Sequence, residues 1–414
     1  MTEKTVKEYY QLRDVPIMVY KPAVLCGKES TAVILMHSDS NYFETAQAYA
    51  IAEKGYYCFV SNSTKRANNL DKKILQLAEV VRFAKKYPGV EKTVLFGHSG
   101  GATLMTAYQA IAENGADMFR QGKHIIDIDD VGDLPAADGV MLIDANFGNG
   151  VMTLLSLDPS IVDEDHPLSK DESLNLLNPE NGYDPNGNFN YSEEFIGRFL
   201  RAQGQRMNRL IRHAQERVRA IERKEGTFTD DEPMVIAGAE QIAPLNKLFP
   251  QVISYFSHTS KRWPLIHQDD SVTEEIVHCV RDVRMPKNWS GSLHSGALQT
   301  TVRNFLKSSA VVTTEEYGYD ETTLYGVDWT SSYCVTVGNA SYISVPMLLM
   351  GLTGSYEYIA AEHVYRQAVR CKDKTVAFVE GAGHNFKAEK EEYGDTVSSC
   401  FNYVDKWLQS RFSG

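Results

Sequence analysis

The sequence lacks long apolar runs and any excess of positive charge. None of its hydrophobic stretches approaches the roughly 18 residues of a transmembrane helix. The first residues, MTEKTVKE, alternate charges where a signal peptide would be apolar. The 54 acidic and 42 basic residues give a formal net charge of −12, which disfavours nucleic acid or an anionic membrane as the main partner. We therefore expect a cytoplasmic protein that acts on a small molecule.

Motifs for bound cofactors and metals are missing as well. The six cysteines form no Cys-x-x-Cys pair, and the zinc motif His-Glu-x-x-His is absent. Neither of the glycine-rich nucleotide motifs, G-x-x-x-x-G-K-[ST] or G-x-G-x-x-G, occurs. We therefore expect no cofactor, no metal site and buried free thiols. The sequence does not determine the oligomeric state, and a homo-oligomer is one of the possibilities.

Strand-like and helix-like segments alternate in two separated parts of the chain. Short apolar runs predict strands at 31–36, 56–60, 93–96, 139–143, 345–350 and 375–379. Helical periodicity lies between and after them, at 44–54, 71–87, 100–113, 359–370 and 391–412. This rhythm predicts an α/β fold with a mostly parallel sheet and helices on both faces. Its two parts are residues 1–150 and 341–414.

The intervening residues, 151–340, do not show this alternation of strand-like and helix-like segments. Turn-rich stretches around 178–187 precede a long amphipathic pattern at 192–224, in which many arginines surround an apolar stripe. We interpret those arginines as a solvated face. The whole segment is expected to form a large, mainly helical cap over the carboxyl edge of the sheet, where open α/β sheets bind ligands.

A serine between glycines follows the predicted strand 93–96. Residues 97–101 read GHSGG, and a helix is predicted directly after them. Gly-x-Ser-x-Gly between a strand and a helix is the pattern of a nucleophile elbow, in which small neighbours allow a tight turn that exposes the serine. Ser99 is therefore the candidate nucleophile. The amide of Gly100, at the helix N-terminus, is a candidate oxyanion donor.

On these residues the chain resembles the α/β-hydrolases over 1–150 and 341–414. The resemblance implies a triad in the order serine, acid, histidine. His384, in the loop VEGAGHNF after the last predicted strand, lies where the family has its general base. A serine hydroxyl is too weak an acid to attack unaided, and an imidazole there would take its proton and return it to the leaving group.

The acid of the triad has two candidates. The family typically has Gly-x-x-Asp after the strand 345–350, but this chain reads GLTGSYE, which contains no aspartate. Glu357 is the first choice, because its spacing to His384 resembles that of the family. Asp144, at the end of the strand 139–143, is the alternative, because some members take the acid from there. Glu362 is interpreted as a first-turn carboxylate favoured by the helix dipole.

The loop after the strand 31–36 reads HSDSNY, where the family commonly has His-Gly. Ser38 replaces that glycine, and its amide is expected to be the second oxyanion donor. Asp39 is expected to turn away from the oxyanion or to bind a polar group of the substrate. His37 and His98 are further substrate-binding candidates, although a histidine at the position of His37 is more often structural, holding the loop, than catalytic.

The leading hypothesis is a serine hydrolase that cleaves a small-molecule ester in a capped pocket. Hydrolysis of a carbon–carbon bond in a ketone or diketone is the runner-up, because the same triad serves both reactions. Acyl transfer to an alcohol or amine is a third possibility. The alternative from a different functional class is a ligand receptor that has kept the fold and lost catalytic turnover. The missing Gly-x-x-Asp supports this alternative.

Overall fold

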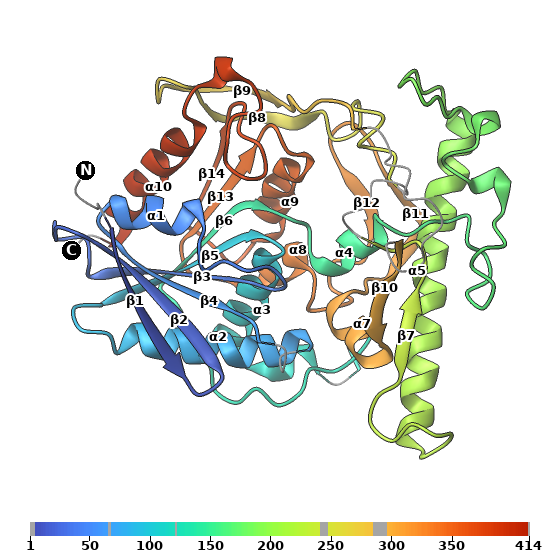
Figure 1. Ribbon diagram of the computed structural model, residues 1–414, viewed down its shortest axis with the longest axis horizontal. Helices are drawn as coiled ribbons and strands as arrows, with labels where there is room; N and C mark the ends of the chain where they lie inside the picture. The colour runs from blue at the N-terminus through green and yellow to red at the C-terminus, as the bar shows by residue number, and fades with distance from the viewer. Residues whose placement is uncertain (1–4, 65–67, 121, 241–246, 285–295, 413–414) are drawn as a thin grey trace.

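A ten-stranded sheet forms the centre of the protein (Figure 1). The computed structural model describes residues 5–64, 68–120, 122–240, 247–284 and 296–412. The strands follow the order β1 (Thr5–Leu12), β2 (Val15–Pro22), β4 (Tyr57–Asn62), β3 (Thr31–His37), β5 (Lys92–Ser99), β6 (Gly139–Ala145), β13 (Met347–Leu352), β14 (Lys374–Val379), β8 (His258–Ile266) and β9 (Val272–His278). From β4 to β8 neighbouring strands run parallel, whereas β1, β2 and β9 are joined by antiparallel pairs at the edges.

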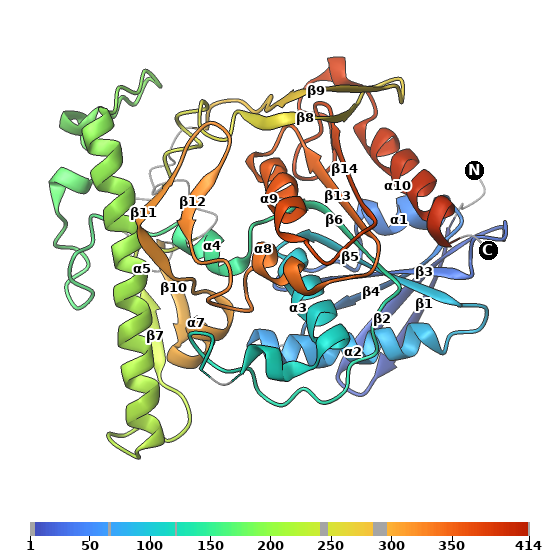
Figure 2. The ribbon, with the colours of Figure 1, turned by 180° about the vertical axis from the view of Figure 1, so that it is seen from behind.

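Helices cover both faces of the sheet, as Figures 1 and 2 show. Helices α1 (Ala46–Glu53) and α10 (Thr396–Phe412) contribute to one apolar cluster. Helices α2 (Leu70–Lys85), α3 (Gly101–Asn114) and α9 (Ala360–Gln367) contribute to the other. The parallel strands are buried on both sides, which is why they read as continuous apolar runs. The predicted α/β fold, a mostly parallel sheet with helices on both faces, is confirmed.

The segment 151–340 differs from the expected helical cap in two respects. Strands β8 and β9 belong to the central sheet, where Leu265 and Ile266 pair with the end of β14. The rest of β8 is polar and pairs with β9, so the sequence showed no apolar run there. The remainder mixes helices and strands. It contains α5 (Glu193–Glu222), α7 (Val302–Ser308), α8 (Thr336–Asn339) and two strand pairs, β7 (Pro233–Ile236) with β10 (Leu298–Thr301) and β11 (Thr313–Tyr319) with β12 (Leu324–Val327). A short helix, α4 (Asn149–Leu154), leads into this segment.

Helix α5 packs its apolar stripe into the same cluster as the sheet, and its other side is largely solvated. Arg206 departs from the predicted solvated face, because its side chain is fully buried. Its guanidinium donates to both carboxylate oxygens of Glu164, at 2.7 and 2.6 Å, and to the carbonyls of Asp158 and Ala237, both at 2.8 Å. The planar fork of arginine thus satisfies its donors inside the protein.

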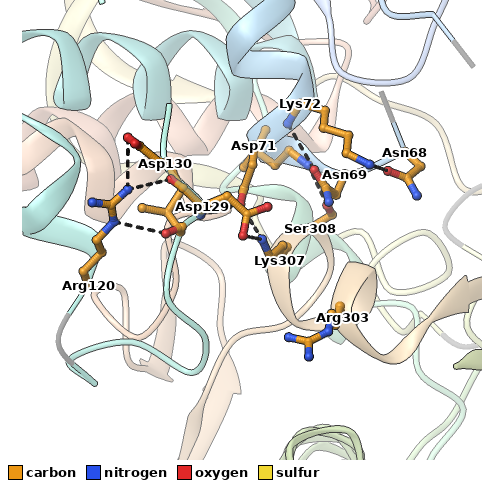
Figure 3. Close-up of polar contacts among 12 residues, drawn as sticks. Asn68, Asn69, Asp71, Lys72, Arg120, Asp129, Asp130, Arg303, Lys307 and Ser308 are labelled. Atoms are coloured by element: carbon orange, nitrogen blue, oxygen red, sulfur yellow. Dashed lines mark hydrogen bonds and ion pairs between the residues drawn. The ribbon is translucent and has the colours of Figure 1, made fainter. Parts of the chain in front are cut away.

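An ion cluster, in which Lys307 and Asp71 are buried and Asp129 is exposed, ties this segment to the core (Figure 3). Lys307, in α7, places Nζ 2.6 Å from Asp71 Oδ2 in α2 and 2.6 Å from Asp129 Oδ1. The amide of Asp129 also donates to Asp71 Oδ2 at 2.9 Å. We call Asp71, Asp129 and Lys307 the anchor cluster. Next to it, the amide of Leu70 donates to Ser308 Oγ at 3.1 Å, so α7 is attached directly to the start of α2.

None of the described helices combines the length and the hydrophobicity needed to cross a bilayer. Residues 1–4, on which part of the signal-peptide argument depends, lie outside the described residues.

Candidate active site

Ser99 is the last residue of β5 and has a left-handed backbone, with φ of 52°. This conformation is costly for a residue with a side chain and is typical of strained functional turns. The neighbouring glycines make it possible. A Cβ on Gly97 would lie 2.7 Å from Ala102 Cα, and one on Gly101 would lie 3.1 Å from Met36 O. The strand–turn–helix geometry that the GHSGG pattern predicts is therefore present.

His384 lies in the loop after β14 and contacts Asp144. Its Nδ1 donates a hydrogen bond to Asp144 Oδ2 at 2.6 Å. Asp144 is fully buried near the end of β6, and its backbone is also left-handed, with φ of 45°. Its other oxygen, Oδ1, accepts the amide of Leu352 at 3.1 Å. Both carboxylate oxygens are therefore held, and the imidazole is fixed in the tautomer that leaves Nε2 to act as a base.

Glu357, the first choice in the sequence, is the more distant of the two carboxylates. It lies in the 3₁₀ turn η6 (Tyr356–Ile359), where its amide donates to Ser355 Oγ at 3.2 Å. Its Oε2 is 3.7 Å from His384 Nδ1, which is too far for a hydrogen bond. The order of the two candidates is thus reversed. The left-handed turn at Asp144 directs its carboxylate toward His384, and spacing along the chain does not report such a turn. Glu362 binds Ser260 and Trp263 instead.

The charges around the imidazole are strongly coupled. Burial lowers the pKa of His384, but the charge of Glu357 and the hydrogen bond to Asp144 outweigh it and raise the pKa to about 9. Burial raises the pKa of Glu357 to about 7, with the charge of Asp144 adding to the effect while His384 and Lys247 oppose it. Near neutral pH, protonation of His384 and ionisation of Glu357 therefore favour each other.

The two predicted oxyanion donors meet at the elbow. A Cβ on Gly100 would lie 2.9 Å from Ser38 Oγ and 3.2 Å from His37 Cε1, so the loop after β3 contacts the start of α3. Ser38 Oγ donates to Asp39 Oδ2 at 2.5 Å and accepts from Asn149 Nδ2 at 3.2 Å. Ser38, Gly100, Ser99 and His384 all line one cavity.

His37 and Asp39 line the same cavity and also hold the loop. His37 Nδ1 accepts the amides of Asp39 and Ser40, both at 2.9 Å. Burial lowers the pKa of His37 to about 4, so the ring is neutral and able to accept. Asp39 pairs with Lys73 at 2.7 Å. Burial opposes ionisation of Asp39, but Lys73 and Ser38 outweigh it and lower its pKa, so the carboxylate is ionised in its pair with Lys73.

His98, predicted as a substrate-binding residue, is buried and is not among the described residues that line the cavity. Its Nε2 donates to the carbonyl of His384 at 2.8 Å, and its Nδ1 accepts from the Tyr42 hydroxyl. Successive side chains of a strand point to opposite faces, so His98 and Ser99 diverge. His98 therefore supports the loop that carries His384.

Ligand-type atoms of His98, Asp144 and His384 lie within 4.8 Å of one another. Each of these groups is engaged in the hydrogen bonds described above, with Tyr42, with the His384 carbonyl or within the His384–Asp144 pair. Both ring nitrogens of His98, Nδ1 of His384 and Oδ2 of Asp144 are thus already engaged in hydrogen bonds.

The cavity has a volume of about 1200 Å³ and lies between the core and the segment 151–340. Core residues form one side, and Met152, Glu240, Lys247 and Leu298 contribute from the inserted segment. Sequence reasoning missed Asn149 and Lys73, which hold Ser38 and Asp39, and Lys247, which interacts with Glu357. No local motif marks these residues, because each acts through a contact with a distant part of the chain.

Comparisons with known proteins find no matching family model or curated protein, and the solved structures named below share 10–12% sequence identity with this chain. Among solved structures, the siderophore hydrolase EstB from Aspergillus fumigatus has a TM-score of 0.46 at 10% identity over 99% of both chains. Est1E from Butyrivibrio proteoclasticus has a TM-score of 0.42 at 10% identity, again over 99% of both chains. A brefeldin A esterase, described as a bacterial homologue of human hormone sensitive lipase, has a TM-score of 0.37 at 12% identity over 99% of this chain and 79% of that one.

Proposed function

We propose that the protein is a serine hydrolase that cleaves a small-molecule carboxylic ester. The observation that carries the proposal is that Ser99, on a strained elbow, shares one cavity with His384, whose Nδ1 is bound to buried Asp144 at 2.6 Å. A nucleophile, a base and a group that orients the base are the components of acyl transfer through a covalent intermediate.

The reaction proceeds in two halves. His384 removes the proton of Ser99 as Oγ attacks the carbonyl carbon, and the carboxylate of Asp144 stabilises the imidazolium. The amides of Gly100 and Ser38 stabilise the tetrahedral oxyanion. The intermediate collapses, the C–O bond breaks, and the alcohol leaves with the proton from His384. Water, activated by the now neutral His384, then cleaves the acyl-enzyme and releases the carboxylic acid.

The receptor alternative loses its main support in this geometry. It rested on the missing Gly-x-x-Asp after the strand that corresponds to β13, and Asp144 supplies a carboxylate from β6. Strain at Ser99 has no evident use in a protein that only binds. Carbon–carbon bond hydrolysis and acyl transfer use the same groups, and product analysis separates them from ester hydrolysis.

A fluorophosphonate probe tests this proposal. We expect one covalent adduct by intact-protein mass, and none in Ser99→Ala. Hydrolysis of p-nitrophenyl acetate should fall on the order of 10⁴-fold or more in that variant. Ser309→Ala is a matched control, because Ser309 also lines the cavity but lies in the inserted segment. Equal labelling or equal turnover in Ser99→Ala would overturn the proposal.

A further inference from the structure

The candidate base faces two carboxylates, and only one of them makes a hydrogen bond to it. Asp144 binds His384 Nδ1 at 2.6 Å, whereas Glu357 Oε2 lies 3.7 Å from the same nitrogen. Glu357 is 6% exposed, and its Oε2 is buried with no hydrogen-bond partner among the described residues. A buried carboxylate oxygen without a partner is costly, so its retention needs an explanation.

Positively charged groups around Glu357 explain how its carboxylate can be ionised inside the protein. The side chain lines the active-site cavity, and Lys247, itself 4% exposed, interacts with it from the inserted segment. The positive charges of Lys247 and protonated His384 thus offset part of the free-energy cost of burying the ionised Glu357 carboxylate. The other titratable or charged groups that interact with this pair are Asp144, Arg284, His98, His37, Tyr356 and Tyr42.

We propose that Glu357 is a second positioning residue for His384, acting on the imidazole through its charge across 3.7 Å while Asp144 acts through a hydrogen bond. The inference deepens the proposed hydrolase function and rests on His384 as its base. An opposite charge at this distance, screened little by water in a buried site, stabilises the imidazolium that forms as Ser99 attacks.

The same charge also favours the imidazolium before substrate arrives. His384 is then neutral, and able to act as a base, only at a higher pH than an isolated imidazole. The acid limb of the pH–rate profile should therefore lie on the alkaline side of the usual histidine value. Glu357 thus links the pH range of activity to Lys247 in the inserted segment.

The test measures the protonation of His384 without ester turnover. Diethyl pyrocarbonate modifies neutral imidazole, and the His384 side chain is 40% exposed. We expect the midpoint of modification at His384, followed by peptide mass spectrometry, to fall by about 1–3 pH units in Glu357→Gln. Glu380→Gln is the matched control, because this carboxylate binds His267 instead, at 2.7 Å, and should leave the midpoint unchanged.

A second variant guards against misfolding of the first. Lys247→Met removes a positive charge that favours ionised Glu357, so it should lower the same midpoint by a smaller amount. An unchanged midpoint in folded Glu357→Gln, or a shift of equal size in Glu380→Gln, would overturn the inference. If instead the midpoint moves as expected but Ser99→Ala hydrolyses esters normally, the proposed function is wrong and the coupling of Glu357 to His384 stands.

Discussion

Two clusters in this protein each place one positive group beside two carboxylates, with different geometry. In the anchor cluster, Lys307 Nζ lies 2.6 Å from both Asp71 and Asp129 (Figure 3). In the active site, His384 Nδ1 lies 2.6 Å from Asp144 and 3.7 Å from Glu357. The first is symmetric and joins the core to the inserted segment. The second is asymmetric and faces a cavity.

The difference follows from the nitrogen that each cluster surrounds. A lysine ammonium has three donors and can satisfy two carboxylates at once, which suits a permanent attachment. An imidazole Nδ1 has one proton and can hydrogen-bond fully to only one carboxylate. The second carboxylate then acts through charge alone and makes the site sensitive to protonation. We infer that the close contacts of Lys307 serve stability, whereas the longer contact between Glu357 and His384 serves the proposed chemistry.

Among changes to these two clusters, the largest effect should come from Asp144→Asn. Loss of the charged hydrogen bond to His384 favours the wrong tautomer and should lower kcat/KM by about 10³-fold, less than the roughly 10⁴-fold seen for a triad with one acid. The smaller loss is expected because Glu357 needs to move only about 1 Å to reach hydrogen-bond distance. Steady-state kinetics with p-nitrophenyl acetate measure this.

The anchor cluster offers a matched control for Asp144→Asn. Asp71→Asn removes the same charge from the anchor cluster and should lower stability while leaving the rate per folded molecule unchanged. If Asp144→Asn and the double variant Asp144→Asn/Glu357→Gln have equal rates, then Glu357 contributes nothing and the two clusters differ less than we infer.

The next effect concerns the anchor cluster. Lys307→Met keeps the length of the side chain and leaves Asp71, which is 1% exposed, without its counter-charge. Removal of one partner of a buried ion pair should lower the free energy of unfolding by about 3 kcal/mol, measured by urea denaturation. Adding Asp71→Asn should restore part of the loss. No loss in the single variant would show that the cluster does not hold α7 on α2.

The smallest effect is a pH dependence of stability. The pKa of Glu357 is raised from 4.5 to about 7, and that of His384 from 6.5 to about 9. The folded protein therefore binds more protons than the unfolded chain in these ranges, and stability should fall as pH rises through them. We expect Tm to fall by about 2 °C between pH 5 and pH 9, in calorimetry. The fall should be smaller in Glu357→Gln, and an equal fall would contradict the assignment.

Local patterns in the sequence were sufficient for the parallel strands, the helices around them and the turn at Ser99. Each depends on residues within a few positions of one another. The apolar runs, the glycines beside Ser99 and the helical periodicity of 100–113 are all of this kind. Strands β8 and β9, at one end of the sheet, were missed, because most of β8 is polar and its register with β9 is irregular. Arg206 was misjudged, because Glu164 and the carbonyls that satisfy it are distant in the chain.

By itself, then, the sequence determined the α/β architecture and the pairing of candidate Ser99 with candidate His384. Only the tertiary structure decided which carboxylate binds the imidazole, since that choice depends on the left-handed turn at Asp144 and on a contact across 240 positions. It also decided that His98 supports the His384 loop and that Lys247 reaches Glu357. The physical reason is that periodicity and turn chemistry are local, whereas the hydrogen bonds and charges of an active site join side chains that only the packed fold brings together.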